Sequence, residues 1–578
     1  MLPKASFFIR PAAVLTLSLL GFAAAGAESR SEAASPALDI ELRPSADGLG
    51  VEVGFVAPNA DEKVSVVEEW GGSIYEDGIL TDVRYRIADG ELRDAEPSGE
   101  LGQWRLSNAA GDRVSLSYRI PVNTYIEGLD GDRYYKPIVT STLVHMIGMQ
   151  GLLLPKGWGK RDRLDVTLRW VGVADGHHAV TSFGVGPGPH RFEAPKGAVR
   201  RALYIAGAGS FFPGEGSNPV HTFVAAGPWR FEAEDFADLA QSIVPAEREF
   251  FGEENAGPFL VSAIPVGPDD PKARSYGGTS LEAAFATFLV PTLEMNDAGR
   301  GGLSYLVAHE KAHTWIGSYV RIGAEPETAG YWFSEGLTHY YTPRMEYRAG
   351  QLDAVGVVER WNHMLSEYAL SPVRDAANAA IADGFWTDRA FQRLPYVRGG
   401  AVALFLDQSE RRRSKGAVRL DTVLLGLIED FRDGGPNKFT EAEFRTVLAD
   451  AGFSSEDLDR AFATVRDGAP LEWPADLLAP CARLVWEEIA TFDTGFEVDE
   501  STGEVLRVDP EGPAHRAGLR AGDRLGGWSI QYDDTSRPVE LQRRVDDGLE
   551  PLSFLPHGPA LRVPQFDIDD ASACADMV

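Results

Sequence analysis

The spacing of apolar residues changes once along the chain, and this change limits the possible folds more than any other feature. From about residue 37 to 225, apolar and polar residues alternate in short runs between glycines and prolines, as in residues 38–42. Alternation of period two indicates half-buried strands. From about residue 228 to 466, apolar residues instead recur every three or four positions, as in residues 236–243, which indicates helices. The sequence therefore predicts a multidomain α+β protein, with a β-sandwich-like domain followed by a mainly helical one.

Three further segments show the strand alternation, and they are residues 51–55, 114–118 and 164–168. The turn before the first of them is expected at residues 46–50. We place the β-rich domain at residues 28–227 and the helical domain at residues 228–466. A chain of 578 residues is too long for one hydrophobic core, so a third domain is expected. Prolines and a glycine predict a linker over residues 467–489, and the last domain then covers residues 490–570.

Residues 1–27 have the composition of a secretory signal peptide. Lys4 and Arg10 precede an apolar run over residues 11–25, and the small residues that follow fit cleavage before Glu28. The run is short and rich in alanine for a membrane span, and an uncleaved anchor is the alternative. We expect export to the periplasm or the medium. We expect no stable membrane insertion after cleavage, because no other apolar stretch of the sequence is long enough to cross a bilayer.

The formal charge of -31 argues against two classes of partner. Nucleic acid and an anionic membrane surface would both repel such a chain, so we expect no nucleic-acid partner. The two cysteines, Cys481 and Cys574, lie near the C-terminal domain. In an oxidising compartment they can form a disulfide, or they can remain free thiols, because sequence separation does not test geometry.

Residues 309–313 carry the motif His-Glu-Lys-Ala-His within the helical region. Positions i and i+4 of a helix share one face, so His309 and His313 can direct two nitrogens at a single point. Leu306 and Ile316 fall on the same stripe, which would seat this face in the interior. The alternative is a buried helix that carries two histidines in ordinary hydrogen bonds.

A tetrahedral metal ion needs a further protein ligand, and Glu335 is the candidate. It follows His313 with 21 residues between them, in the segment YWFSEGLTHYY. Ser334 can cap a helix that begins at Glu335, and the aromatic residues would bury the carboxylate. Two histidines, a glutamate and an open fourth position are typical of catalytic zinc, whereas structural sites are closed and rich in cysteine. The sequence thus predicts one Zn²⁺ ion.

The segments HEKAHTWIG and WFSEGLTHYYTPRM resemble the glycyl aminopeptidase family, peptidase family sixty-one. This family belongs to the gluzincin metallopeptidases, which include thermolysin and the membrane aminopeptidases. The resemblance implies a β-rich N-terminal domain, a thermolysin-like catalytic domain and a C-terminal PDZ domain. It also implies hydrolysis of peptide bonds by a water molecule that zinc activates. Glu310 would then act as general base; otherwise it is an ordinary glutamate on a helix surface.

A tyrosine is expected to stabilise the oxyanion beside zinc, because the relatives have one in a motif similar to Tyr-x-Lys-Gly. This chain has LPYVRGG, with Arg398 in place of the lysine, so Tyr396 is the candidate. Without the resemblance, an aromatic residue beside a proline would more often serve packing.

Two positions depart from the family pattern. The family has a segment similar to GGLEH, whose acidic residue binds the free amine of the substrate. This chain keeps Gly277 and Gly278, but Glu282 is displaced by two residues. Glu282 either still binds the amine or is an ordinary glutamate of an enzyme that does not require a free N-terminus. His339 stands where relatives have an acidic residue that orients a zinc ligand, and we expect a packed or hydrogen-bonded core histidine.

The segment VLRVDPEGPAHRAGLRAGDRL resembles part of a PDZ domain. We expect a strand over residues 505–508, a short helix from Pro513 and a second helix over residues 539–545. That second helix and the strand after Thr494 would form a groove that binds peptide termini. The candidate groove residues are Gly495, Phe496, Leu541 and Val545. Alternatively, the domain only packs on the catalytic domain.

The leading hypothesis is an exported zinc metallopeptidase, acting as an aminopeptidase on short peptides with small N-terminal residues. The preference for small residues is implied by the resemblance alone. One alternative is an endopeptidase that acts on unfolded exported proteins delivered by the PDZ domain. The other is a non-catalytic peptide-binding protein, against which stands the presence of all the candidate site residues in the sequence.

Overall fold

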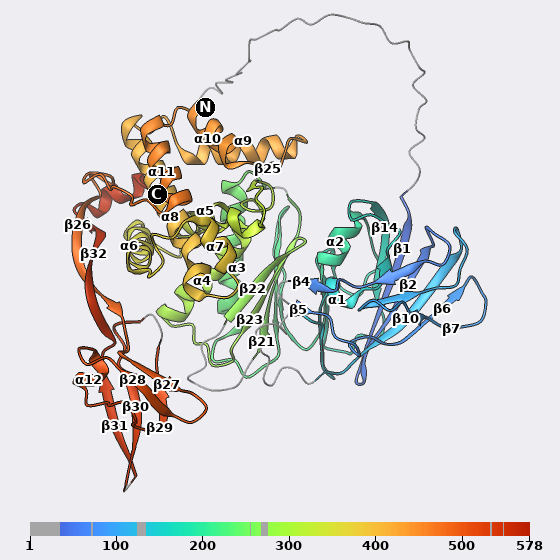
Figure 1. Ribbon diagram of the computed structural model, residues 1–578. Coiled ribbons are helices and arrows are strands. Elements are labelled where there is room, and N and C mark those ends of the chain that lie inside the picture. Colours follow the sequence, from blue (N-terminus) through green and yellow to red (C-terminus); the bar gives the residue numbers. More distant parts are fainter. Residues whose placement is uncertain are drawn as a thin grey trace, which may run out of the picture.

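The computed structural model describes residues 35–70, 73–123, 135–254, 256–266, 276–531, 534–546 and 548–578. The predicted signal peptide lies outside the described residues. Figure 1 shows a β-rich N-terminal domain, a second domain of helices on a sheet, and a small C-terminal unit at the end of a long two-stranded ribbon. In the described part of the chain, no helix is long and apolar enough to cross a membrane.

The N-terminal domain contains three main sheets. The strands of the first, in spatial order, are β17 (His190–Pro195), β14 (Arg163–Trp170), β1 (Ala37–Ser45), β2 (Gly48–Val56), β10 (Arg113–Pro121), β6 (Thr81–Ile87) and β7 (Arg93–Asp94). The second contains β13 (Leu154–Pro155), β3 (Lys63–Ser65), β9 (Gln103–Arg105) and β8 (Glu96–Pro97). The third contains β11 (Ile138–Val139), β12 (Leu143–Ile147), β18 (Leu203–Gly207), β15 (His178–Thr181) and β16 (Gly184–Val185). Short elements complete the domain, and they are β4 (Glu69–Trp70), β5 (Ser73–Ile74), α1 (Gly148–Gly151) and α2 (Lys196–Arg201).

The four strands predicted from alternation are confirmed, and they lie within β1, β2, β10 and β14. The turn between β1 and β2 is shorter than predicted, because Ser45 already pairs with Gly48. Buried side chains of the first sheet share one hydrophobic core with the second sheet and with one face of the third. This is the sandwich-like arrangement that period-two alternation indicates.

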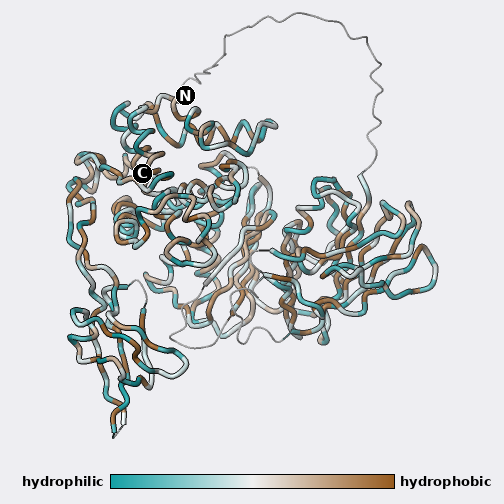
Figure 2. The backbone as a smooth tube through the Cα atoms, viewed as in Figure 1, coloured by the Kyte–Doolittle hydropathy of each residue, from teal (hydrophilic) through white to brown (hydrophobic). Residues whose placement is uncertain are grey.

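The third sheet is buried on both faces, and consecutive residues of its strands are accordingly buried, as in β18. In β12, Val144 and Met146 belong to the core of the N-terminal domain, whereas Leu143 belongs to a second hydrophobic cluster. That second cluster also contains Leu260 and Phe288 from the sheet of the next domain. The two domains therefore share an apolar interface. Figure 2 shows hydrophobic stretches along the strands and helices of both domains.

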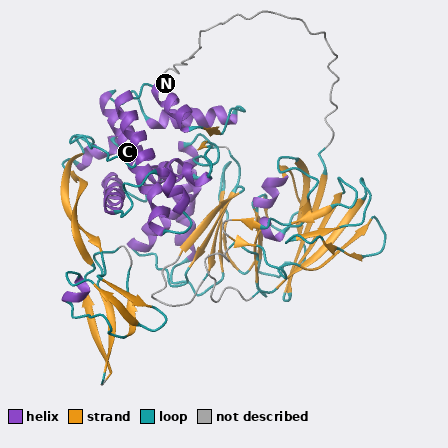
Figure 3. Ribbon diagram, in the orientation of Figure 1, coloured by secondary structure: helices purple, strands orange, loops and turns teal. Residues whose placement is uncertain are grey.

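The second domain is a five-stranded mixed sheet with helices packed against it (Figure 3). Its strands in spatial order are β19 (Gly209–Phe212), β20 (Val220–Ala225), β21 (Phe259–Pro265), β23 (Ala284–Leu289) and β22 (Tyr276–Leu281). The helices are α3 (Ala233–Phe250), α4 (Asp297–Ala312), α5 (Tyr331–Arg348), α6 (Ala354–Leu370), α7 (Asn378–Gly384), α8 (Arg389–Arg413), α9 (Leu420–Arg432), α10 (Glu441–Asp450) and α11 (Ser455–Asp467). Minor elements are β24 (Arg321–Ile322), η1 (Glu327–Gly330) and β25 (Lys438–Phe439).

The border between these two domains lies earlier than predicted. Strands β19 and β20 fall inside the predicted N-terminal domain, residues 28–227, yet they pair with β21 in the sheet of the second domain. The change of apolar spacing near residue 228 marks the first helix of the second domain, α3, and not the first element of that domain. Residues 236–243 do form part of α3, and their apolar members are buried as predicted.

The C-terminal unit is reached by an antiparallel ribbon of β26 (Ala482–Phe492) and β32 (His557–Ile568). Strand β26 begins inside the predicted linker, residues 467–489. Hydrogen bonds attach the ribbon to α6. Asn362 donates to the carbonyl of Phe566 at 2.9 Å and accepts from its N–H at 2.7 Å, and Gln565 donates to the hydroxyl of Ser366 at 3.0 Å. The other elements are β27 (Phe496–Asp499), β28 (Glu504–Val508), α12 (Pro513–Arg516), β29 (Leu525–Ser529), β30 (Val539–Val545), β31 (Gly548–Phe554) and η2 (Ala571–Asp576).

The predicted second PDZ helix is wrong, because residues 539–545 form β30, the central strand of a three-stranded sheet. The run Val-Glu-Leu at its start also fits period two, and Val539 and Leu541 are both buried. A segment of seven residues is short enough to fit both the helical and the strand spacing of apolar residues. This one forms a strand because it pairs with β29 on one edge and with β31 on the other. The strand at 505–508 and the helix from Pro513 are confirmed.

The predicted peptide groove does not form in the described part of the C-terminal unit. Leu541 lies in the small core of this unit, whereas the side chain of Val545 is exposed. Phe496 packs against the same core, and Gly495 approaches Pro513, where an added Cβ would lie 2.8 Å from the proline ring. The structure therefore does not show a PDZ domain.

Cys481 and Cys574 form a disulfide. Cys481 immediately precedes β26 and Cys574 lies in η2 just after β32, so the bond closes the base of the ribbon. Both sulfurs belong to residues buried in the core of the second domain. Of the two alternatives left open by the sequence, the structure shows the bonded one.

Candidate metal centre

Three potential metal ligands meet between α4 and α5, and they are His309, His313 and Glu335. The two Nε2 atoms are 3.3 Å apart. One carboxylate oxygen of Glu335 lies 3.4 Å from His309 Nε2 and 3.2 Å from His313 Nε2. Zinc–ligand bonds of about 2.0–2.1 Å at tetrahedral angles would separate the ligand atoms by about 3.3–3.4 Å. The three atoms thus have the spacing of one face of a tetrahedron, which leaves a fourth position for another ligand.

The helix that carries Glu335 begins earlier than predicted. Helix α5 starts at Tyr331 with Gly330 as its cap, so Ser334 lies inside the helix and caps nothing. Glu335 therefore sits in the second turn. His309 lies in the last turn of α4, and His313 is the C-terminal cap residue of that helix.

The charges around the three ligands favour a cation at their centre. Burial lowers the pKa of the His309 imidazole to about 4. Burial alone would also lower the pKa of His313, but Glu335 and Glu310 outweigh it and raise this pKa to about 9. For Glu335, burial would raise the pKa, yet the two imidazoles hold it well below its usual range. Two imidazoles and the carboxylate of Glu335 are a donor set that fits zinc, and Glu310 adds negative charge beside them.

Hydrogen bonds behind the imidazoles fix their orientation. Nδ1 of His313 faces the carbonyl oxygen of Ile316 at 3.1 Å. Nδ1 of His309 lies 3.4 Å from the hydroxyls of both Tyr305 and Thr342. With Nε2 directed at the metal position, each Nδ1–H donates to its oxygen partner.

His339 contacts the metal ligands through Tyr305, whose hydroxyl is hydrogen-bonded to its Nδ1. Burial, followed by the charge of Arg393, holds the pKa of His339 well below its usual range, so the neutral ring can accept this bond. The expectation of a hydrogen-bonded core histidine is therefore confirmed. The sequence analysis missed Tyr305, although its position four residues before His309, on the same helix face, was a usable signal.

Glu310 and Tyr396 are the two further candidate residues next to His309. The pKa of Glu310 is raised to about 7, mainly by burial. The charge of His313 acts to lower this pKa, and the charge of Glu335 acts to raise it. The ring of Tyr396, from α8, stacks on that of His309 with centroids 5.8 Å apart and planes at 19°. Burial and then the carboxylates of Glu335 and Glu310 raise the pKa of Tyr396, so its hydroxyl stays protonated and can donate a hydrogen bond. A buried carboxyl group and a protonated hydroxyl thus lie beside the candidate metal position.

Glycines bring α5 and α8 into direct backbone contact beside the site. A Cβ on Gly399 would lie 2.0 Å from the carbonyl oxygen of Trp332, and one on Gly336 would lie 2.4 Å from the Cα of Gly399. Gly336 directly follows the ligand Glu335. The close approach therefore sets the distance between Glu335 on one helix and Tyr396 on the other.

Arg398, which stands in place of the family's lysine, has a structural role. Its side chain is buried and donates to the carbonyl oxygens of Arg374 at 2.6 Å, Ala376 at 2.7 Å and Val465 at 3.2 Å. It fastens α8 to the segment after α6 and to α11. Nothing in these contacts links its charge to the metal centre.

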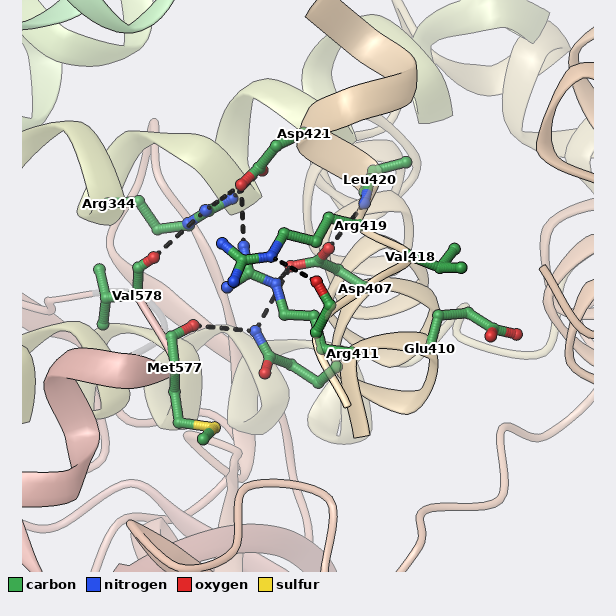
Figure 4. Close-up of polar contacts among 12 residues, drawn as sticks. Arg344, Asp407, Glu410, Arg411, Val418, Arg419, Leu420, Asp421, Met577 and Val578 are labelled. Atoms are coloured by element: carbon green, nitrogen blue, oxygen red, sulfur yellow. Dashed lines mark hydrogen bonds and ion pairs between the residues drawn. The ribbon is translucent and has the colours of Figure 1, made fainter. Parts of the chain in front are cut away.

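A buried network of charges holds the opposite side of α5 (Figure 4). Arg344 donates two hydrogen bonds to Asp421, at 2.6 and 2.8 Å. Arg411 bridges Asp421 at 2.9 Å and Asp407 at 2.8 Å, and Asp407 accepts from Tyr340 at 2.5 Å. These contacts join α5, α8 and the start of α9. The helix that supplies Glu335 is thus held on two sides, by the glycine contact and by this network.

The edge strand β22 passes beside α4, and it carries the glycine pair Gly277 and Gly278. A Cβ on Gly278 would lie 2.3 Å from the ring of Phe285, so only glycine fits there. The hydroxyl of Ser280 donates to the carbonyl oxygen of Glu310. Glu282 lies in the turn after β22 and pairs with Arg201 at 2.7 Å. The strand therefore places Ser280, and not Glu282, in contact with the motif helix.

Comparison with known proteins agrees with this geometry. Residues 303–387, which include His309, His313 and Glu335, match the family described as M61 glycyl aminopeptidase. Leukotriene A-4 hydrolase from Xenopus laevis is 28 % identical over 168 residues, which cover 27 % of this chain and 25 % of that protein. The chain thus spans a quarter of the length of this relative.

One of the similar solved structures shares the fold over most of the chain. An aminopeptidase N family protein from Idiomarina loihiensis superposes with a TM-score of 0.69 at 15 % identity, covering 93 % of this chain and 99 % of that chain. An M1 zinc metallopeptidase from Deinococcus radiodurans gives a TM-score of 0.44 at 17 % identity, covering 76 % of this chain and 95 % of that chain. The likeness at 15 % identity shows a common architecture. The family match and the His-His-Glu geometry support a gluzincin peptidase.

Proposed function

We propose that the protein is a zinc-dependent peptidase that hydrolyses peptide bonds at the His309–His313–Glu335 centre. The observation that carries this proposal is the triangle of ligand atoms, 3.2 to 3.4 Å on each side, with Glu310 and Tyr396 next to it. A zinc ion held there would polarise the scissile carbonyl and lower the pKa of a water molecule in the open position.

The side chains of the chain itself would move the protons. Glu310 takes a proton from the attacking water and delivers it to the leaving amine, for which a pKa raised to about 7 by burial is well suited. Tyr396 donates its hydroxyl hydrogen to the carbonyl oxygen as negative charge develops on that oxygen. Tyr305 and Thr342 hold the imidazole of His309 in place.

The substrate would be an extended peptide. Strand β22 is at the edge of its sheet and passes next to Glu310, so its free backbone groups can pair with a peptide as an added strand. The small pair Gly277 and Gly278 keeps side chains away from this edge. The disulfide supports maturation in an oxidising compartment, in agreement with the predicted export.

Two modes of cleavage are distinguished by separate observations. The glycyl aminopeptidase match and the fold of an aminopeptidase N family protein favour removal of N-terminal residues, with small residues preferred. The position of Ser280 favours an endopeptidase, because no carboxylate of β22 is placed beside α4 to bind a free amine, and Glu282 is engaged by Arg201. We propose aminopeptidase activity as the first mode and endopeptidase activity as the second.

Glu310→Gln tests the reaction, with Glu359→Gln on the exposed face of α6 as matched control. Both variants should bind one zinc per chain by elemental analysis. Hydrolysis of a peptide library should fall by at least about 10³-fold in the first variant and remain unchanged in the second. Bound metal without hydrolysis by the wild type would contradict the peptidase and favour a peptide-binding protein.

N-terminal acetylation of the cleaved peptides separates the two modes. An aminopeptidase loses these substrates, whereas an endopeptidase cleaves them at the same internal bonds. Mass spectrometry of the products reports the cut positions and the residues on each side.

A further inference from the structure

A second polar site adjoins the metal centre. A cavity of about 180 Å³ lies between α4, α5, α6 and α8. Its polar walls come from Tyr305, His339, Arg360, His363 and Arg393. We name this group the arginine pocket. The volume is large enough for a side chain of a bound peptide, and the reaction proposed above uses neither of the two arginines.

The arginine pocket shares its wall with the metal centre. The hydroxyl of Tyr305 is 3.4 Å from Nδ1 of the ligand His309, and the ring of His339 is 6.4 Å from that of His309. On the other side, the guanidinium carbon of Arg393 lies 5.4 Å from the ring centroid of Tyr396. The ring of His309 therefore stands between the pocket and the metal position, because its Nδ1 faces Tyr305 and its Nε2 faces the other two ligands.

The charge that faces the pocket is positive. Arg393 is paired with Glu367 at 2.5 Å, and Arg360 lies 3.5 Å from Glu346. Neither glutamate is among the residues that line the cavity, so the acids stand behind the arginines. Glu367 also faces the exposed His363 at 3.5 Å. Glu346 is completely buried, and burial raises its pKa to about 7, which reduces the charge it sets against Arg360.

Both guanidinium groups have donors to spare. Arg360 uses one nitrogen for the carbonyl oxygen of Gly301 at 3.0 Å and for Glu346. Arg393 uses Nε and one terminal nitrogen for Glu367. An arginine carries five N–H donors in a planar fork that fits the two oxygens of a carboxylate, the anionic group that a peptide substrate offers. The side chains of both arginines are one-third or more exposed, so these donors are open to a ligand.

We propose that the arginine pocket binds a carboxylate of the peptide substrate close to the scissile bond. This proposal rests on the peptidase function proposed above and adds the chemical class of substrate. The carboxylate has two sources, an acidic side chain or the C-terminus of a short peptide.

Three peptides distinguish the two sources. The first has an acidic residue next to the scissile bond and an amidated C-terminus, the second has a neutral residue and a free C-terminus, and the third is neutral and amidated. The measurement is the ratio of kcat/KM for each carboxylate peptide to that for the third. A loss of activity that affects all three peptides equally cancels in this ratio. The cancellation is needed because Arg393 also contacts Tyr396, so its replacement can lower activity on every peptide.

Arg360→Gln and Arg393→Gln are the test variants, and Arg348→Gln is the control. Arg348 is as exposed as Arg393, pairs with one glutamate, Glu249, and does not line the cavity. We expect each test variant to lower the ratio roughly 10-fold or more, as for other hydrogen bonds to charged groups, and the control to leave it unchanged. A fall for the first peptide identifies a side-chain carboxylate, and a fall for the second identifies the C-terminus. Equal losses for all three peptides, or no change in either ratio, would overturn the proposal.

A binding measurement separates failure of the pocket from failure of the peptidase. In the Glu310→Gln background, calorimetry should show that Arg360→Gln weakens binding of the preferred carboxylate peptide roughly 10-fold, and leaves the neutral amidated peptide unaffected. Equal affinities with and without Arg360 would overturn the pocket. If the wild type cleaves no peptide, the proposed function fails, and the pocket is decided by this binding experiment alone.

Discussion

The helices that carry the metal centre and the C-terminal unit are built in opposite ways. Helices α5 and α8 touch backbone to backbone at Gly336 and Gly399, and a buried network of arginines and aspartates holds them from behind. Among the described residues, the C-terminal unit has a hydrophobic core of six buried residues. Its ion pairs lie at the surface, as between Arg507 and Glu497, and Leu506 and Leu549 are more than half exposed. One part is held by many buried contacts, and the other by few.

This difference teaches where sequence changes should be tolerated. Buried charges and overpacked contacts are costly to disturb, because a removed partner leaves an unpaired group and an added atom finds no space. Surface ion pairs contribute little, about 0–1 kcal/mol. The site helices should therefore respond strongly to small changes that the C-terminal unit absorbs.

The largest effect is expected from one methyl group. In Gly399→Ala the new Cβ meets the carbonyl oxygen of Trp332 at 2.0 Å, so α5 and α8 must separate. We expect a loss of about 3–5 kcal/mol in the free energy of unfolding, together with loss of bound metal. Gly527→Ala in β29 is the matched control, because nothing lies within 4 Å of its added Cβ. Thermal melting and metal content check both, and equal melting temperatures would contradict the comparison.

The second effect concerns the link between the two parts. Replacing Cys481 and Cys574 by serine removes a bond that closes a segment with a sequence separation of 93 residues. We expect a loss of about 2–4 kcal/mol, mainly through a less restricted unfolded chain. The metal centre should survive, because its ligands lie on α4 and α5 and not on the ribbon. Limited proteolysis should then cut the C-terminal unit first, and simultaneous loss of metal would show that the two parts are not independent.

The sequence predicts the same two parts with unequal success, for a physical reason. The spacing of His309, His313 and Glu335 is dictated by chemistry that tolerates few arrangements, and the structure brings all three together. The short run at 539–545 obeys both helical and strand periods, and only its neighbours β29 and β31 make it a strand. A long-range pairing of this kind leaves no mark within the segment itself.

Other features of the site were beyond sequence reasoning for a related reason. The glycines after Glu335 and Arg398 were visible, but their purpose depends on how two helices cross, which no local pattern encodes. Likewise, the start of the second domain at β19 is defined by its pairing with β20, which in turn pairs with β21. The sequence left open whether Glu282 binds the substrate amine or is an ordinary glutamate, and its partner Arg201 lies 81 residues earlier in the chain.

The third prediction concerns how a buried carboxyl group changes the pH dependence of stability. Burial raises the pKa of Glu346 on α5 from 4.5 to about 7. Since the folded state holds this proton more tightly than the unfolded state, the wild type loses stability as pH rises from about 4.5 to about 7. Glu346→Gln cannot ionise, so its stability relative to the wild type should rise by about 1–3 kcal/mol across this window and stay level above it.

Glu550→Gln is the counterpart of that variant in the C-terminal unit. Glu550 is half exposed and paired with Arg543 at the surface. We expect a change of at most about 1 kcal/mol. Melting temperatures of both variants and the wild type between pH 4 and pH 8 check the pair of predictions. A curve for Glu346→Gln parallel to that of the wild type would contradict the buried-charge argument.

The smallest effect is expected from removal of a single hydroxyl group beside a metal ligand. In Tyr305→Phe, Nδ1 of His309 keeps Thr342 at 3.4 Å but loses the phenol that connects it to His339. An imidazole held by fewer acceptors is a less basic and less fixed ligand, so the zinc affinity of the folded protein should fall by about 10-fold. Tyr347→Phe, a half-buried tyrosine two turns beyond His339 on α5, is the control and should retain wild-type affinity. Competition with a chelator of known affinity measures both. Because a purely structural role for Tyr305 would lower the melting temperature and leave the affinity of the folded protein unchanged, the two measurements together decide whether this hydroxyl acts on the metal ligand.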